Sequence, residues 1–121
     1  MSKSENTKTR IAALQMVSAP RVADNLAEAG RLLAEAAKRG ATLAVLPEYF
    51  CIMGMKDTDK VGVREPDGSG PIQDFLSNAA KQNGLWIVGG SVPLVASDPG
   101  RVLNTCLVFD DTGKQIGRAH V

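Results

Sequence analysis

The chain has 121 residues, of which 44% are hydrophobic and 22% are charged, a composition typical of one globular domain or of part of a larger one. Its 14 Lys and Arg residues nearly cancel its 13 Asp and Glu residues, which leaves a formal net charge of +1. Because no basic field is available to follow a phosphate backbone, we expect no nucleic-acid partner. No apolar run approaches the ~20 residues that a membrane span requires, so we expect no membrane association.

The cysteine count and the N-terminus indicate the compartment. Two cysteines, Cys51 and Cys106, are too few for a secreted disulfide scaffold and form no metal-binding pair. Residues 1–9 are polar and lack the apolar segment of a signal peptide, so we expect a disordered lead-in before a domain that spans residues 10–121. Together these features predict a reducing, cytoplasmic location.

The first third of the chain predicts a strand, a helix and a second strand. Residues 11–17 are almost continuously apolar, as expected of a strand buried on both faces. From residue 22 to 39 the apolar positions repeat at helical spacing, with Asp24 in the first turn and Gly40 after the last. Residues 42–46 form another buried strand. A unit of this spacing implies parallel strands joined by a right-handed crossover.

The remainder predicts a mixed sheet. Residues 51–70 lose periodicity and predict a long excursion loop. Pro71 then opens a helix that stops at Asn83-Gly84. Three more strands are predicted at residues 85–90, 102–109 and 114–118, the last two as a hairpin around a tight turn at 110–113. The expected fold is α/β, and its final hairpin leaves an uncovered sheet edge.

Glu48 is the strongest candidate for a chemical role. It follows the strand at residues 42–46 and Pro47, and ligands in open α/β sheets bind beyond the carboxyl ends of strands. Its apolar neighbours Leu46 and Phe50 predict partial desolvation, which would raise the pKa of Glu48 toward that of a general base. The alternative is a solvated glutamate that opens a loop, and position and flanks leave the two interpretations level.

Other polar features favour structural roles. Cys51 is close to Glu48 in sequence, but nothing near it would stabilise a thiolate, so a buried, unreactive thiol is expected there and at Cys106. Gly68-Ser69-Gly70 could hold an anion, although a plain turn before a helix is the better interpretation. Gly89-Gly90-Ser91 predicts a close approach of two backbone segments. His120, near the chain end and without an evident partner, is expected to be solvated.

Several segments, taken in order, carry a family resemblance. They are Arg10-Ile11-Ala12-Ala13-Leu14-Gln15, Leu46-Pro47-Glu48-Tyr49-Phe50, Leu85-Trp86-Ile87-Val88-Gly89-Gly90-Ser91, Leu103-Asn104-Thr105 and Asp110-Asp111-Thr112-Gly113. Their order and spacing resemble the N-terminal part of the nitrilase, or carbon–nitrogen hydrolase, superfamily. The branch with the greatest similarity is the Nit-type and omega-amidase-like amidases. The resemblance implies part of an α-β-β-α sandwich.

The resemblance also implies a chemistry. Members of this superfamily use a Glu-Lys-Cys triad, in which Glu48 would be the general base that takes a proton from the cysteine thiol. The thiolate attacks the carbon of a small amide or nitrile, the lysine stabilises the oxyanion, and water hydrolyses the thioester. No metal or organic cofactor is implied.

Two triad members do not match. Without gaps, Val121 falls where the family has its lysine, and neither Cys51 nor Cys106 matches the motif of the nucleophile. We therefore expect an N-terminal fragment of an amidase that is inactive alone. The alternative is a non-catalytic α/β module that forms a homo-oligomer or binds another chain through its exposed sheet.

Overall fold

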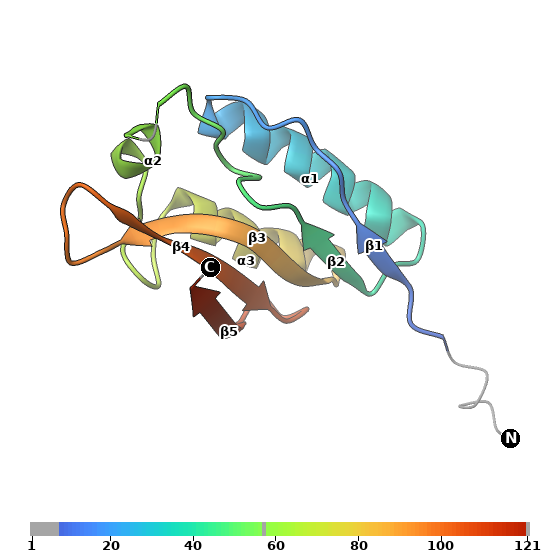
Figure 1. The fold of residues 1–121 in the computed structure, drawn as a ribbon. Coiled ribbons are helices and arrows are strands. Elements are labelled where there is room, and N and C mark those ends of the chain that lie inside the picture. Colours follow the sequence, from blue (N-terminus) through green and yellow to red (C-terminus); the bar gives the residue numbers. More distant parts are fainter. Residues whose placement is uncertain (1–7, 57, 121) are drawn as a thin grey trace, which may run out of the picture.

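A computed structural model describes residues 8–56 and 58–120 of the protein. Its elements are β1 (Ile11–Ala13), α1 (Val22–Lys38), β2 (Leu43–Leu46), α2 (Asp59–Gly62), α3 (Pro71–Asn83), β3 (Trp86–Val95), β4 (Val102–Phe109) and β5 (Gln115–His120). The five strands form one sheet in chain order, in which β1, β2 and β3 are parallel and β4 and β5 continue antiparallel (Figure 1). This arrangement confirms the predicted α/β fold with a mixed sheet. Most of the predicted disordered lead-in lies outside the described residues.

Both long helices cover one face of the sheet. The connections β1–α1–β2 and β2–α3–β3 each lead to the next strand in the same direction across the sheet. Because connections between parallel strands are right-handed, both helices lie on the same side of the sheet. The helix ends follow their sequence signals: Gly40 has φ +88° after α1, Pro71 is the first residue of α3, and Gly84 has φ +61° after α3. Within residues 8–56 and 58–120, neither long helix covers the other face of the sheet.

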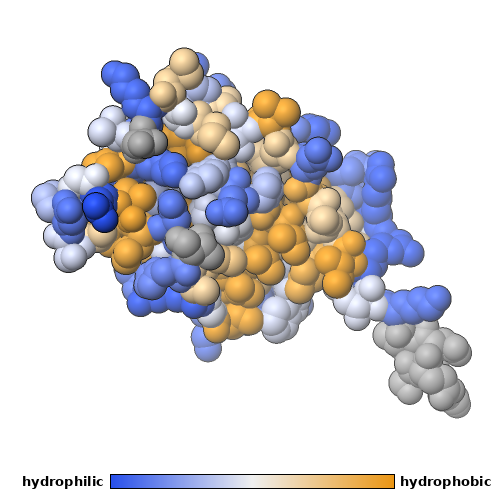
Figure 2. Space-filling view, in the orientation of Figure 1, coloured by the Kyte–Doolittle hydropathy of each residue, from blue (hydrophilic) through white to orange (hydrophobic). Residues whose placement is uncertain are grey.

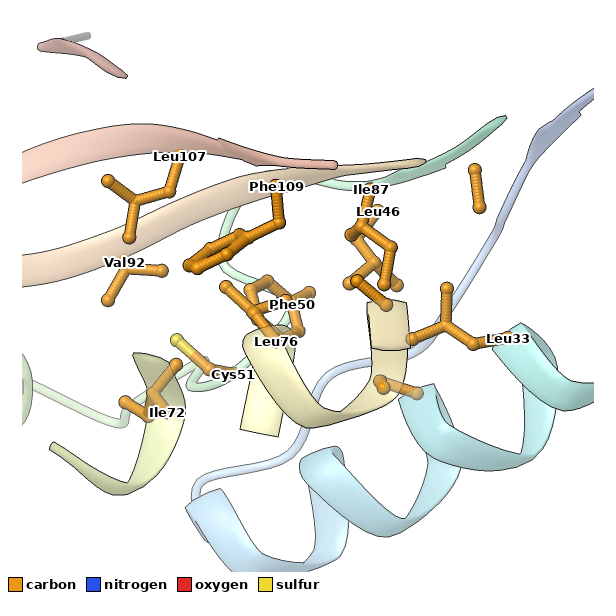
Figure 3. Packing of buried hydrophobic residues seen from close by; sticks show 14 of the residues in the cluster. Leu33, Leu46, Phe50, Cys51, Ile72, Leu76, Ile87, Val92, Leu107 and Phe109 are labelled. Atoms are coloured by element: carbon orange, nitrogen blue, oxygen red, sulfur yellow. The ribbon is translucent and has the colours of Figure 1, made fainter. Parts of the chain in front are cut away.

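The core lies between the sheet and the two helices. Leu33 of α1 and Leu76 of α3 are fully buried against Ile87 of β3 and Leu107 of β4 (Figure 3). The segment after β2 also enters this core, because Phe50 and Cys51 are fully buried. The loop that carries Glu48 is therefore anchored on both sides by the main core.

Three elements differ from their predictions. β1 has only 3 residues and is an edge strand with Ile11 61% exposed, because it pairs on one side only and its outer face is uncovered. The excursion loop contains α2 and a bridge between Glu65 and Leu94. β3 continues to Val95, since the glycines at 89–90 accompany a register shift instead of ending the strand.

Candidate functional site

Glu48 lies directly after β2, at the carboxyl end of that strand as predicted. Its side chain is exposed. Leu46 and Phe50, which were expected to shield it, are 1% and 0% exposed because they point into the core between sheet and helices. Glu48 follows the end of β2 in a turn, in which the Phe50 N–H donates to the Pro47 carbonyl at 3.2 Å, so its side chain is left exposed between these two buried residues. The predicted partial desolvation of Glu48 is wrong for this structure.

The turn that carries Glu48 rests on β3. The Tyr49 backbone N–H donates a hydrogen bond of 2.9 Å to the Ser91 hydroxyl, although these residues are 42 positions apart. Gly90 packs against the same turn: a Cβ atom there would lie 1.9 Å from the Pro47 carbonyl oxygen. This confirms that Gly89-Gly90-Ser91 allows two backbone segments to approach closely.

Lys60 of α2 contacts the turn from another direction. Its ammonium group lies 3.6 Å from the centre of the Tyr49 ring, a cation–π contact. The excursion loop thus folds back over the segment that follows Glu48, which its irregular sequence did not reveal.

Asn25 secures the segment after Glu48 to α1. It is 2% exposed, and its side-chain amide accepts a hydrogen bond of 2.7 Å from the Ala19 N–H and donates one of 2.9 Å to the Cys51 carbonyl. Sequence reasoning missed this residue. The signal was present, because Asn25 precedes Ala29 by four residues and Leu33 by eight, about one and two helical turns, so it belongs to the buried stripe of α1.

Neither cysteine is prepared to act as a nucleophile. Burial raises the pKa of Cys51 to about 12, and the thiol donates only to the Ser91 carbonyl at 3.6 Å. Burial also raises the pKa of the half-buried Cys106. Since the thiolate is the reactive form, both groups are unreactive near neutral pH. The expectation of buried, inert cysteines is confirmed for Cys51, whereas Cys106 is only partly buried.

The Gly-Ser-Gly segment does not present free amides at the start of α3. The carboxylate of Glu65, which is 4% exposed, accepts hydrogen bonds of 2.6 Å from the Ile72 N–H and 3.1 Å from the Gln73 N–H. An internal carboxylate therefore occupies the place that a bound anion would take at a helix N-terminus. The interpretation as a plain turn before a helix is confirmed.

His120, near the chain end, has a partner on the neighbouring strand. The His120 ring is exposed, but its Nδ1 lies 3.1 Å from the Thr105 hydroxyl, so the expectation of a histidine without a partner is wrong. β-Pairing of Thr105 with His120 brings them together.

Within residues 8–56 and 58–120, no cluster of three or more His, Cys, Asp or Glu residues could hold a metal ion. No helix in the described part of the chain is long and apolar enough to cross a membrane.

Comparison with known proteins decides the family. A sequence profile described as carbon-nitrogen hydrolase matches residues 10–120. The chain belongs to the carbon–nitrogen hydrolase family. This confirms the resemblance that the segments around Glu48 and Gly89-Gly90-Ser91 carry.

The similar members of this family are Nit-type proteins and amidases. The chain is 36% identical to omega-amidase NIT2-B of Xenopus laevis over 107 residues, which cover 88% of this chain and 37% of the relative. It is 34% identical to deaminated glutathione amidase of a Synechocystis strain over 110 residues, which cover 90% of this chain and 40% of the relative. The chain thus spans about two-fifths of the length of these carbon–nitrogen hydrolases.

Solved structures agree with this assignment. Nit3 of Saccharomyces cerevisiae, a member of branch 10 of the nitrilase superfamily, superposes with a TM-score of 0.81 at 26% identity, covering 93% of this chain and 43% of Nit3. An amidase from Nesterenkonia sp. superposes with a TM-score of 0.75 at 22% identity, covering 93% of this chain and 42% of the amidase, and supports the fold alone. The five-stranded sheet with its two helices is therefore a nitrilase-type arrangement.

Proposed function

We propose that this chain supplies the glutamate-bearing part of an amidase that cleaves a small carboxamide, with Glu48 as general base. The observation that carries the proposal is the position of Glu48: a carboxylate at the carboxyl end of a central parallel strand, on a turn held by β3, in a chain of the carbon–nitrogen hydrolase family. The names of the relatives, omega-amidase and deaminated glutathione amidase, support an amide substrate.

The proposed reaction needs two groups that the described site does not supply. Glu48 would take the proton of a cysteine thiol, and the thiolate would attack the amide carbon, with a lysine ammonium group balancing the charge of the tetrahedral oxyanion. Glu48 would pass this proton to the amide nitrogen, so that the C–N bond breaks and ammonia leaves, and the carboxylate thus restored would activate the water that hydrolyses the thioester to acid and free thiol. Cys51 does not fit this nucleophile, because it is buried within the core and burial raises its pKa to about 12. We therefore propose that the chain alone has no amidase activity.

Ammonia release tests both parts of the proposal. The purified chain, incubated with a panel of small carboxamides, should release no ammonia above the buffer level. A chimera that continues from the end of β5 into the remaining part of the Xenopus laevis omega-amidase should turn over its amide substrate. In the chimera, Glu48→Gln should lower kcat by about 10²-fold or more, the usual contribution of a general base.

Glu28→Gln is the matched control in the chimera, because Glu28 is an exposed glutamate of α1 paired with Arg31, remote in sequence from the turn. Its kcat should equal that of the unchanged chimera. Turnover by the isolated chain that disappears with Glu48→Gln would contradict the proposed inactivity. Equal kcat values for the Glu48→Gln and Glu28→Gln chimeras would contradict the proposed role of Glu48.

A second candidate function is favoured by the sheet face away from the helices. Val45 of β2, Val88 of β3 and Val108 of β4 lie side by side in register, and the neighbouring residue Ile87 is buried on the helix side. These valines therefore line the opposite face, which also carries Trp86, 40% exposed. Figure 2 shows apolar surface across the strands in this view. We propose, as the alternative, a non-catalytic module that forms a homo-oligomer by covering this face.

Light scattering after size-exclusion chromatography distinguishes this alternative. The unchanged chain should then elute with the mass of an oligomer, and Val88→Lys should convert it to a monomer. Val17→Lys is the control, since Val17 is 97% exposed and lies outside the strands. A monomer at every concentration would reject the alternative. For either function we propose a reducing, cytoplasmic setting, which the two free cysteines support.

A further inference from the structure

Glu48 is followed by a residue with an unusual backbone conformation. Tyr49 has φ +56°, and it is the only non-glycine residue with positive φ within the described part of the chain. The left-handed region is unfavourable for a residue with a Cβ atom by roughly 1–2 kcal/mol and persists only where surrounding contacts impose it. Since Tyr49 sets the direction in which the chain leaves Glu48, the contacts that impose its conformation also orient Glu48.

Two hydrogen bonds hold the turn: the Phe50 N–H donates to the Pro47 carbonyl at 3.2 Å, and the Tyr49 N–H donates to Ser91 of β3. Ser91 is 2% exposed, and its hydroxyl accepts the Tyr49 N–H at 2.9 Å. Its own position is fixed, because its carbonyl accepts the Cys51 thiol from the core side. β3 pairs with β2 up to Gly89 and with β4 before and after the segment that carries Ser91, so this segment is held at both ends.

A local irregularity of β3 places Ser91 against the turn. The pairing of β3 with β4 shifts register between Gly89 and Val92, and Gly90 and Ser91 lie within the shifted segment. Such irregularities redirect side chains and are frequent beside active sites. Here the irregularity accompanies the contact of Gly90 with Pro47, where a Cβ atom would meet the carbonyl oxygen, and it aims the Ser91 hydroxyl at Tyr49.

We propose that Ser91 is a positioning residue for Glu48. By accepting the Tyr49 N–H, its hydroxyl holds the left-handed turn that keeps the Glu48 backbone in one orientation at the carboxyl end of β2. Lys60 is stacked on the Tyr49 ring and restrains the ring, whereas Ser91 contacts the Tyr49 backbone N–H, which the turn's own hydrogen bond from Phe50 to Pro47 leaves without a partner. This inference rests on the proposed role of Glu48, although the geometry of the turn does not depend on that role.

NMR spectroscopy of the whole chain tests the proposal without any need for turnover. In the unchanged protein the Tyr49 amide hydrogen should exchange slowly with solvent. The nuclear Overhauser cross-peak between the amide hydrogen and the Hα of Tyr49 should be intense, because a positive φ brings these two hydrogens close together. In Ser91→Ala, exchange of that amide should become about fivefold faster or more, the cross-peak should weaken, and the backbone order parameter of Glu48 should fall. Ser91→Thr, which keeps the hydroxyl, should restore all three signals.

Ser77→Ala is the control for loss of a hydroxyl hydrogen bond elsewhere, because the Ser77 hydroxyl donates to the Gly113 carbonyl at 2.6 Å. It should leave the signals of Tyr49 and Glu48 unchanged. The proposal is overturned if Ser91→Ala keeps the slow exchange of Tyr49 or the order of Glu48, or if Ser77→Ala changes them equally. A rapidly exchanging Tyr49 amide in the unchanged protein would overturn it even if Ser91→Ala failed to fold. Glu48→Gln should leave the Tyr49 signals intact, because the Glu48 side chain takes no part in the hydrogen bond between Tyr49 and Ser91. These signals therefore test the role of Ser91 separately from the amidase proposal, which ammonia release tests.

Discussion

Removal of the Glu65 carboxylate should destabilise the whole fold, even though Glu65 lies in the excursion loop. The carboxylate is 4% exposed and accepts three N–H groups: the backbone N–H of Ile72 at 2.6 Å, and the backbone and side-chain N–H groups of Gln73 at 3.1 Å each. The Glu65 backbone is paired with β3 through the Pro93 carbonyl and the Val95 N–H, both at 2.9 Å. One residue therefore joins the loop, the first turn of α3 and the central strand.

The expected loss follows from these contacts. In Glu65→Gln, one carboxylate oxygen becomes an NH₂ group that faces N–H donors, so one acceptor is lost and the remaining bonds lose their charge assistance. Hydrogen bonds to a charged group contribute roughly 1.5–3 kcal/mol each. Counting the substitution as the loss of two such bonds, at about 1.5 kcal/mol each, lowers the free energy of unfolding by about 3 kcal/mol. Since domains of this kind are stable by only about 5–15 kcal/mol, this is a large fraction of the free energy of unfolding.

Urea unfolding followed by circular dichroism measures this loss. Glu65→Gln should lower the midpoint of unfolding strongly without changing the slope. Glu28→Gln is the matched control, because it removes the charge of an exposed glutamate paired with Arg31 and should leave the midpoint unchanged. If Glu65→Gln unfolds at the same urea concentration as Glu28→Gln, the reasoning about the buried carboxylate is wrong.

Two further predictions concern the turn and the core. Gly90→Ala should destabilise the fold by about 3 kcal/mol or more in the same urea assay, because its Cβ atom would overlap the Pro47 carbonyl oxygen. Gly117→Ala is the control and should change the midpoint little, because nothing lies within 4 Å of the new atom. Burial raises the pKa of Cys51 from about 9 to about 12, so the folded state keeps a proton that the unfolded state loses. This stabilisation is complete below pH 9 and is lost as the pH rises toward 12. Between pH 8 and pH 10.5 the unchanged protein should therefore lose about 2 kcal/mol more stability than Cys51→Ala, and equal losses would contradict the assigned burial.

The fold was predictable where local patterns and chain connectivity agree. The helical stripe of Ala29 and Leu33, the stop signals Gly40 and Gly84, and the crossovers determine two helices on one face of a parallel unit. The prediction failed for β1, because a continuous apolar run cannot reveal whether both of its faces are covered. Ile11 is apolar and yet 61% exposed.

The site was predictable only in part, for a related reason. The position of Glu48 at the end of β2 could be predicted from the strand and the proline that precede it, since that signal is local. The residues that support the turn could not be predicted in the same way. Ser91 and Lys60 reach it only through the pairing of β3 and the return of the excursion loop. The glycine pair before Ser91 predicted a close approach, but the sequence alone did not identify the segment that it approaches.

The exposed Glu48 lies close in sequence to the uncovered face of the sheet. β2 carries Val45 on the face that no described helix covers, and Glu48 follows three residues later, just after the end of the same strand. A polypeptide that packed on Val45, Val88 and Val108 would remove water from this end of β2 as well. We therefore expect that desolvation of Glu48, which a general base requires, depends on the same contact that buries the apolar face. A second copy of this chain and a polypeptide that supplies the cysteine and the lysine would then compete for this one surface.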